Sequence, residues 1–214
     1  DLPENDPRLF GSKEEFTTDG NANFMWMQTF WSHLSDKGTA AVVMANGAMT
    51  SNNKGEKNVR QHMVDHGMVD CIVRLPDKLF LTTGIPACIF ILSKNRDGKD
   101  RIHRKREDEV LFIDLSKLGR MESRKLRVFD NEDLKKATDT YHAWRNRHGE
   151  DNGRSHPIKQ DSKIDSEVGG SLSTDKGRQS HEYTDAPGFC YAATIDEIAK
   201  QDYKLTPGIY VGSE

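Results

Sequence analysis

The sequence lacks the features of several classes of protein. No apolar run approaches the roughly 20 residues that a membrane-spanning helix needs, and residues 1–20 are polar and mixed in charge, unlike a secretory signal. The net charge of the 214 residues is only −3, so any contact with nucleic acid depends on local patches rather than on the whole chain. These absences favour a cytoplasmic protein with one sizeable α/β core or two small ones.

Cysteine is scarce, and its placement excludes the usual metal-binding motifs. The chain has 3 cysteines, Cys71, Cys88 and Cys190, and none of them has CxxC or related spacing. A small odd number of cysteines is typical of a reducing compartment. Cys71 and Cys88 lie inside apolar runs, so we expect them to be small buried side chains.

Apolar periodicity predicts alternating helices and short strands. We expect strands at 39–46, 68–75, 85–92 and 110–116, and helices at 23–34, 56–66, 130–147 and 194–201. The run at 39–46 is nearly continuous in apolar residues, as in a buried parallel strand. The strands at 68–75 and 85–92 are close enough in sequence to pair antiparallel at an edge. This order predicts a doubly wound, Rossmann-like α/β sheet with an antiparallel last strand.

The first helix has a wide apolar face. Asn21 or Asn23 is expected to cap it, because asparagine side chains accept hydrogen bonds from free helical N–H groups. Phe24 and Met27 begin the apolar stripe, and Trp26 and Phe30 widen it. We therefore expect this helix to be largely buried.

Two later helices carry end signals. Gly67 stands where a glycine that ends a helix is expected. Asp130 is expected to cap the helix at 130–147. The apolar face of that helix contains Leu134, Ala137, Tyr141 and Trp144.

Composition divides the chain into four stretches. Residues 1–95 and 96–148 hold the strand and helix patterns of one domain, whereas residues 149–185 have no periodicity, which predicts a flexible polar insertion or linker. Residues 186–214 form a tail with a short helix, because Thr194-x-x-Glu197 is a capping box. We expect the LTPGIYVG segment that follows to be extended.

His62 and His66 form a candidate metal pair. Their i, i+4 spacing on a helix can present two ligands to one ion. No Glu follows His62 and no third ligand is evident. We favour the alternative, in which they are surface or helix-end histidines.

Two basic segments follow strands. The segment Lys94–Arg106 holds seven Lys or Arg against two Asp, and Lys117–Arg127 holds five against one Glu. Such clusters suit contacts with phosphates, because each neutralised phosphate releases counterions. We take Arg101, Arg104, Lys105 and Arg106 as candidates for DNA phosphate contacts. An ordinary solvated loop is the alternative.

The stretch LFLTTGIPACIFILSK has more than a strand requires. Phe80 and a Thr-Thr-Gly turn precede the apolar run, and an exposed aromatic ring there can stack on an extruded base. Such stacking contributes about 1–3 kcal/mol per base. Thr82 and Thr83 can hydrogen-bond a base or a phosphate, and Pro86 suits the start of an edge strand. A core phenylalanine beside a loop without function is the alternative.

Five segments resemble, in the same order, the modification (methyltransferase) subunit of type I restriction-modification enzymes. They are GNANFMWMQTFWSHL, GTAAVVMANGAMTSN, VDCIVRLPDKLFLTTGIPACIFILSK, LFIDLSKLG and PGFCYAATIDEIAKQDYKLTPGIYVG. The resemblance covers most of residues 1–145 and 186–214. It implies a doubly wound methyltransferase fold and transfer of a methyl group from S-adenosylmethionine to the N6 amine of adenine in DNA. It also implies assembly with a DNA-specificity subunit and a restriction subunit.

The resemblance gives roles to some of these residues. It makes 39–46 the fifth strand, and 68–75 and 85–92 the terminal pair. Phe80 falls where related adenine methyltransferases place the ring that stacks on the flipped adenine, so that Thr82, Thr83 and Pro86 would line the base pocket. Asn23 and Trp26 fall near the helix start that borders the cofactor's adenine.

The sequence also departs from the family. It contains no glycine-rich turn for the cofactor and no Asn-Pro-Pro-Phe motif, and Asn5-Asp6-Pro7-Arg8 is no substitute. With Asp at position 1, we expect the C-terminal part of a longer subunit, inactive alone, and we assign no catalytic residue. A non-catalytic assembly or DNA-binding module is the main alternative, and an unrelated α/β enzyme is a third. Alone, the chain should bind S-adenosylmethionine weakly or not at all, and should associate. The tail from Pro187 onward is expected to help assembly.

Overall fold

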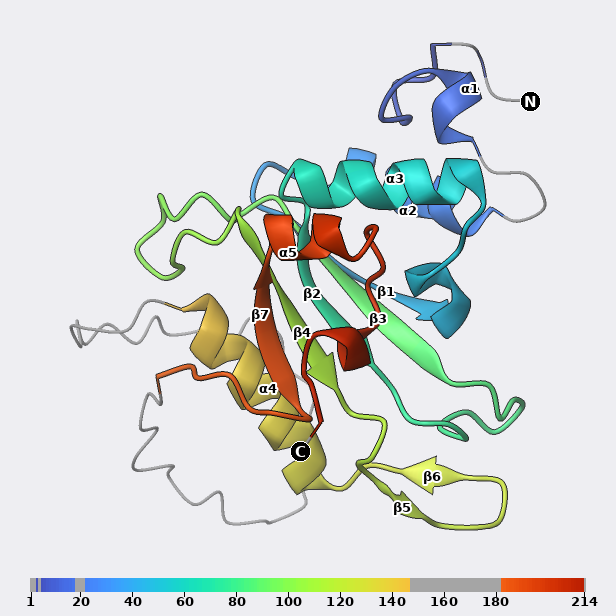
Figure 1. Cartoon of the computed structure of the whole chain (residues 1–214), viewed down its shortest axis with the longest axis vertical. Coiled ribbons are helices and arrows are strands. Elements are labelled where there is room, and N and C mark those ends of the chain that lie inside the picture. Colours follow the sequence, from blue (N-terminus) through green and yellow to red (C-terminus); the bar gives the residue numbers. More distant parts are fainter. Residues whose placement is uncertain (1–2, 4, 18–21, 147–181, 214) are drawn as a thin grey trace, which may run out of the picture.

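A computed structural model describes residues 3, 5–17, 22–146 and 182–213 of the chain (Figure 1). Most of the expected polar insertion, residues 149–181, lies outside them. The described residues form a mixed sheet with helices on both faces, which confirms the predicted doubly wound α/β fold. None of their helices has the length and apolarity that crossing a membrane requires.

The main sheet has five strands in the order β1-β3-β2-β4-β7. These strands are β1 (Thr39–Ala45), β2 (Val69–Arg74), β3 (Ala87–Ser93), β4 (Glu109–Asp114) and β7 (Cys190–Thr194). β2 is parallel to β4, β3 is antiparallel to both β1 and β2, and β7 is antiparallel to β4. β1, β2 and β4 therefore finish at the same end, which we call the carboxyl end of the sheet; the opposite end is the amino end.

The antiparallel pairing of β2 with β3 is confirmed, but its expected place at an edge is wrong. β1 flanks β3 in register from Thr39↔Ser93 to Ala45↔Ala87, and β4 flanks β2. Pro86 therefore does not begin an edge strand. It comes just before β3, where its missing N–H is outside the ladder, and its carbonyl accepts a hydrogen bond from the Asn46 N–H at 3.4 Å.

Within the described residues, β1 lies at an edge of the sheet and its one neighbour, β3, is antiparallel, which differs from the buried parallel strand that was expected. Its residues alternate in exposure, and the side chain of Val43 is 57% exposed. The apolar run alone does not distinguish the two cases, because Ala and Val suit both a central strand and an edge strand.

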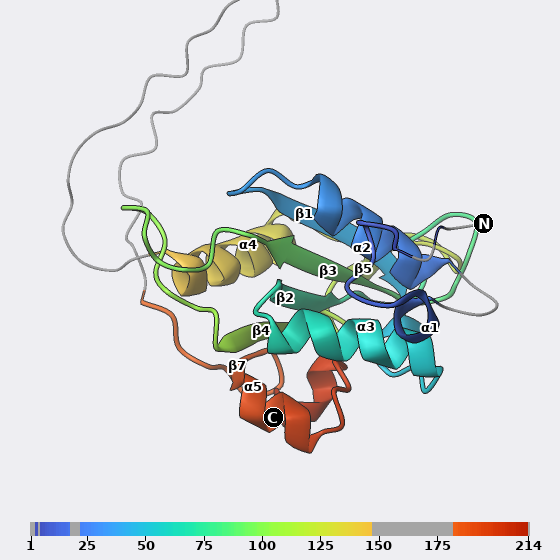
Figure 2. The same cartoon turned by 90° about the horizontal axis from the view of Figure 1, so that it is seen from above.

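Helices cover both faces of the sheet. One face packs against α2 (Asn23–His33), α3 (Lys54–Asp65) and α5 (Ile195–Lys200), with the short turns η1 (Asn46–Met49) and η2 (Pro207–Ile209). The other packs against α4 (Asn131–Arg145). Figure 2 shows α3 and α4 on opposite sides of the sheet. Outside these layers, α1 (Lys13–Phe16) packs on α3, and β5 (Arg120–Met121) pairs with β6 (Arg127–Val128).

The first long helix, α2, departs from its prediction in two respects. Ala22 occupies the N-cap position without a side-chain hydrogen bond, so neither asparagine caps the helix, and Asn23 is its first residue. Trp26 and Phe30 are 57% and 40% exposed, so the helix is only half buried. The described residues cover these two side chains only in part, and periodicity cannot reveal whether a partner exists for such a face.

The predicted end signals of α3 and α4 agree more closely with the structure. Asn53 caps α3 with its side chain, which starts the helix two residues before the predicted position, and Gly67 ends it with φ +62°. Asp130 caps α4 within a capping box, as predicted. Trp144 is fully buried against the sheet, but Leu134 is 50% exposed at the start of α4 and is not part of the core.

The C-terminal residues belong to the sheet. The capping box of Thr194 and Glu197 is confirmed, but strand β7 before it was not predicted. The segment after α5 was expected to be extended, yet it turns through η2. Tyr210 then stacks on Phe112 of β4, with ring centroids 4.0 Å apart. Because β7 and η2 pack on β4, this tail completes the core.

Candidate nucleic-acid interface

The β2–β3 loop, residues 75–86, leaves the carboxyl end of the sheet and returns through a tight turn. At its base, the Leu75 N–H donates to the Ala87 carbonyl at 2.9 Å. Nearer the tip, the Lys78 N–H donates to the Gly84 carbonyl and the Thr83 N–H to the Phe80 carbonyl, each at 3.4 Å. These bonds hold Phe80 at the tip.

The tip is apolar and exposed. Phe80 is 38% exposed and Leu81 82% exposed, and Ile85 on the return side is 65% exposed. Thr82 and Thr83 are also exposed, and the Thr83 hydroxyl accepts a hydrogen bond from the Ile85 N–H at 3.1 Å. The structure therefore places Phe80 and both threonines together at the surface, and it contradicts the alternative of a core phenylalanine.

Arg127 of β6 ties this loop to the β5–β6 hairpin. Its backbone N–H donates to the Lys78 carbonyl at 2.8 Å, and its guanidinium lies 3.2 Å from the Asp77 carboxylate. The same guanidinium donates to the carbonyls of Leu118 and Gly119 at 3.3 and 3.2 Å. Lys78 itself has φ +58°, a backbone conformation that side chains disfavour. The loop is thus held in a defined position.

The first basic segment lies at the amino end of the sheet, far from the loop (Figure 1). Arg106 is 1% exposed and pairs with the buried Asp70 at 2.7 Å, so its assignment to DNA phosphate is wrong. Arg104 pairs with Glu109 and also donates to the Trp144 carbonyl. Arg101 and Lys105 are exposed, but they lie at the amino end of the sheet, whereas Phe80 lies at the carboxyl end.

Asp70 joins several elements inside the protein. Besides Arg106, its carboxylate lies 3.3 Å from the Arg96 guanidinium and accepts the Tyr141 hydroxyl at 2.6 Å. Burial lowers the pKa of Arg96 to about 10, which leaves it cationic at neutral pH. Burial raises the pKa of Tyr141, and the Asp70 charge adds to that shift. These groups hold the chain before β4 and the helix α4 against β2.

The two helix histidines stack on each other. The rings of His62 and His66 have centroids 3.8 Å apart, and Phe10 stacks on His62 from the other side at 4.6 Å. Partial burial, followed by the His66 charge, lowers the pKa of His62. Within the described residues, no group of three or more His, Cys, Asp or Glu could hold a metal ion. The geometry supports helix-end histidines.

The three cysteines are free and buried, and for Cys71 and Cys88 this burial was expected. Burial raises the pKa of Cys88 to about 12, and raises those of Cys71 and Cys190 as well. Thiols in this state are poor nucleophiles.

A small pocket adjoins the start of α2. Its volume is about 220 Å³, and its lining includes Trp26, Met25 and Thr29 of the helix, with Asp6 and Arg8 opposite. Hydrogen bonds from Arg8 lower the pKa of Asp6 to about 2. Trp26 thus faces a pocket, whereas Asn23 is not among the lining residues.

Comparisons with known proteins agree on one family. Residues 3–214 match the N-6 DNA methylase family. The type I restriction enzyme HindI methylase subunit of Haemophilus influenzae is 37% identical over 194 residues, which is 91% of this chain and 34% of that protein. The MjaIX methylase subunit of Methanocaldococcus jannaschii is 32% identical over 209 residues, or 97% of this chain and 31% of that protein. The chain therefore spans about a third of the length of these curated relatives.

A solved structure supports the fold. The methyltransferase subunit of a type I restriction-modification system from Streptococcus thermophilus superposes with a TM-score of 0.66, at 22% identity. The superposition covers 96% of this chain and 33% of that one. At this identity, the match establishes the fold alone.

Proposed function

The chain belongs to the N-6 DNA methylase family, and we propose that it forms part of a type I restriction-modification methyltransferase subunit. The complete protein would transfer a methyl group from S-adenosylmethionine to the N6 amine of adenine in DNA. One observation carries this proposal: Phe80 is exposed at the tip of a loop that leaves the carboxyl end of parallel strands. Open α/β sheets bind their ligands at this end.

In this proposal, Phe80 offers the face on which the flipped adenine stacks. An enzyme that modifies a base must take it out of the duplex and then hold it. Thr82 and Thr83 are exposed in the same turn, so their hydroxyls would hydrogen-bond the base edge or its phosphate, and Pro86 borders the same loop. The chain's part in the reaction is to orient the base; we assign no general base to it.

The described residues do not fit S-adenosylmethionine as a complete site. The pocket beside α2, at about 220 Å³, is below the roughly 300–1,000 Å³ of small-molecule sites. Its carboxylate, Asp6, is held by Arg8 at 2.8 Å and is not free to bind a ribose hydroxyl. We therefore propose only that Trp26 and Asn23 border a site that other parts of the complete protein form, and we derive no step through the cofactor.

We also propose the partners of this family, a DNA-specificity subunit and a restriction subunit. The earlier expectation that the tail from Pro187 helps assembly needs a test other than deletion. Removing the tail would remove β7 and with it one edge of the core. Substitutions at exposed tail positions, such as Ile209, which is 41% exposed, would leave the fold intact.

The test of the base site is a pair of substitutions at Phe80 in the complete methyltransferase. Phe80→Ala should lower kcat/KM for duplex DNA about 5- to 150-fold, since stacking contributes about 1–3 kcal/mol. Phe80→Trp should retain most activity. Ile102→Ala is the control, because Ile102 is also exposed, at 64%, but lies at the amino end. Unchanged methylation by Phe80→Ala would refute the proposed role.

A further inference from the structure

We propose that the β5–β6 hairpin, residues 117–128, contacts the phosphate backbone of the DNA duplex next to the extruded base. This inference rests on the proposed function and extends it to a second surface. The sequence has two basic segments, Lys94–Arg106 and Lys117–Arg127. The expected phosphate contacts all lie in the first of them, whereas the hairpin contains the second. The fold places the two segments at opposite ends of the sheet, and only the hairpin shares its end with Phe80 (Figure 1).

The hairpin is fixed beside the β2–β3 loop. Arg127 binds the Lys78 carbonyl with its backbone and the Asp77 carboxylate with its side chain, so β6 is attached two residues before Phe80. Figure 1 shows the hairpin and the β2–β3 loop projecting side by side from the lower right of the molecule. A duplex whose base reaches Phe80 therefore has its backbone near the hairpin.

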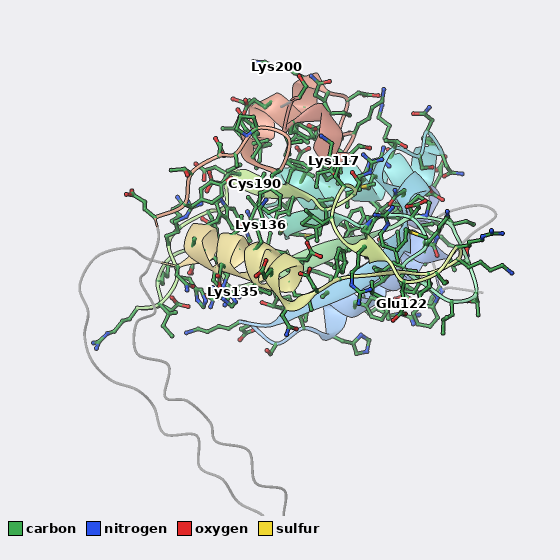
Figure 3. All side chains as sticks on the ribbon, turned by 90° about the horizontal axis from the view of Figure 1, so that it is seen from below. Lys117, Glu122, Lys135, Lys136, Cys190 and Lys200 are labelled. Carbon is green, nitrogen blue, oxygen red and sulfur yellow. The ribbon has the colours of Figure 1, made fainter. Side chains whose placement is uncertain are left out.

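The hairpin carries positive charge that no other described residue neutralises. Arg120, Arg124 and Lys125 are exposed, and their side chains form no ion pair or hydrogen bond with any residue that the structure describes. The hairpin has one acidic residue, Glu122, which also faces solvent (Figure 3). The nearby Asp77 is already paired with Arg127.

A further carboxylate at this end is neutralised too. Asp114, at the end of β4, lies 3.3 Å from the guanidinium of Arg74. The hairpin itself thus keeps a surplus of cations, although Asp130, Glu132 and Asp133 follow it at the start of α4. The buried arginines of the other segment pair with Asp70 instead. Duplex DNA carries about one negative charge per 1.7 Å of its axis, which makes it a matched partner for such a surface.

The hairpin also has a defined shape. Its turn is closed by the Glu122 N–H, which donates to the Leu126 carbonyl at 2.9 Å, and the strands pair as Arg120↔Val128 and Met121↔Arg127. Gly119 has φ +80°, and an added Cβ there would lie 2.8 Å from the Val128 carbonyl oxygen. The backbone that carries the cations is therefore ordered before DNA arrives, which lowers the entropic cost of binding.

The test compares two triple variants in the complete methyltransferase complex. The first is Arg120→Gln, Arg124→Gln and Lys125→Gln in the hairpin. The second is Lys99→Gln, Arg101→Gln and Lys105→Gln, which removes the same charge at the amino end. The readout is the equilibrium affinity for duplexes with and without the recognition site, measured at several salt concentrations.

The hairpin variant should weaken binding to both duplexes alike. The slope of log affinity against log salt should fall by about 2–3, because each lost phosphate contact removes about 0.9. The amino-end variant should keep the slope of the unaltered complex. An unchanged slope in the hairpin variant, or a loss confined to the amino-end variant, would overturn the inference.

Two further readouts separate this inference from its premise. If Phe80→Ala lowers methylation as predicted while the hairpin variant binds DNA normally, the hairpin contact is refuted and the base site is supported. If Phe80→Ala has no effect while the hairpin variant loses slope, the base site fails instead. Size-exclusion chromatography checks the assembly: loss of the specificity subunit with a normal DNA slope would show that the hairpin binds a protein, and would also overturn the inference.

Discussion

A single carboxylate connects three parts of the protein. Asp70 is the second residue of β2, and it binds two arginines from the chain between β3 and β4 and a tyrosine from α4. Trp144 closes the cluster, with the Arg106 guanidinium 5.7 Å from its ring centroid. Two buried cations thus depend on one buried anion.

Removing that anion should be strongly destabilising. We predict that Asp70→Asn lowers the free energy of unfolding by about 3–5 kcal/mol, because it leaves Arg96 and Arg106 buried without a counter-charge. Urea denaturation measures the change. Glu107→Gln is the control: Glu107 is exposed and 3.8 Å from Lys105, so its loss should change stability by less than about 0.5 kcal/mol. Equal stability of the two variants would contradict the role given to Asp70.

The sequence offered the exposed ring as one of two alternatives, and it did not identify the buried cations. Phe80 stands in a turn before a strand, a local pattern that allows exposure but also allows a core phenylalanine. A basic run does not show which of its members turn inward, and Arg106 was therefore placed on DNA. A signal did exist: Asp70 interrupts an apolar strand, and a buried carboxylate requires a cationic or hydrogen-bonding partner.

Among the elements, the β2–β3 loop and the β5–β6 hairpin are connected through Arg127. Its guanidinium contacts Asp77 on the loop and donates to the Leu118 carbonyl at the start of the hairpin. The start of the hairpin also depends on Gly119, whose φ of +80° suits glycine alone.

Changing the hairpin's shape should therefore mimic the loss of its charge. We predict that Gly119→Ala reduces the salt slope of DNA binding, as the hairpin charge variant does, although no charge is altered. The added Cβ would lie 2.8 Å from the Val128 carbonyl oxygen and would push strands β5 and β6 apart. Gly47→Ala is the control, because nothing lies within 4 Å of a Cβ there. A normal slope in Gly119→Ala would mean that the hairpin's shape is unimportant.

Local signals predicted some elements and missed others. The capping box of Thr194 and Glu197 and the cap at Asp130 are local signals, so the sequence was sufficient to find both, although the box that Asp130 forms with Asp133 was not predicted. Strand β7 was missed because CYAAT is short, and its partner β4 lies about eighty positions earlier in the chain. The antiparallel β2–β3 pair was predictable from the short connection, but its flanking strands were not.

At the scale of the whole molecule, one side of the sheet is unfinished within the described residues. β1 pairs with β3 on one side alone, and Val43 on β1 is 57% exposed. Trp26 and Phe30 on α2 add to the apolar surface beside this edge, and Phe30 and Val43 line one groove. Exposed edges and apolar patches of this kind promote association.

The 214-residue chain on its own should therefore associate through this edge. We predict that Val43→Lys shifts it toward monomer in sedimentation velocity, because a charged side chain on an edge strand opposes pairing with another chain. Ile102→Lys is the matched control at the amino end, where Ile102 is 64% exposed but stands apart from the edge, and it should leave association unchanged. Equal effects of both substitutions would show that net charge, and not the edge, governs association.

The most direct test of the base site is photo-crosslinking. The complete methyltransferase complex would be bound to a duplex carrying 5-iodouracil in place of the methylated adenine, irradiated, and digested for mass spectrometry. We predict an adduct on Phe80, because an extruded base would stack on that ring. The same duplex with 5-iodouracil at a neighbouring position should give no Phe80 adduct. A crosslink from the target position to a peptide outside residues 75–86 would contradict the assignment of this loop to the base.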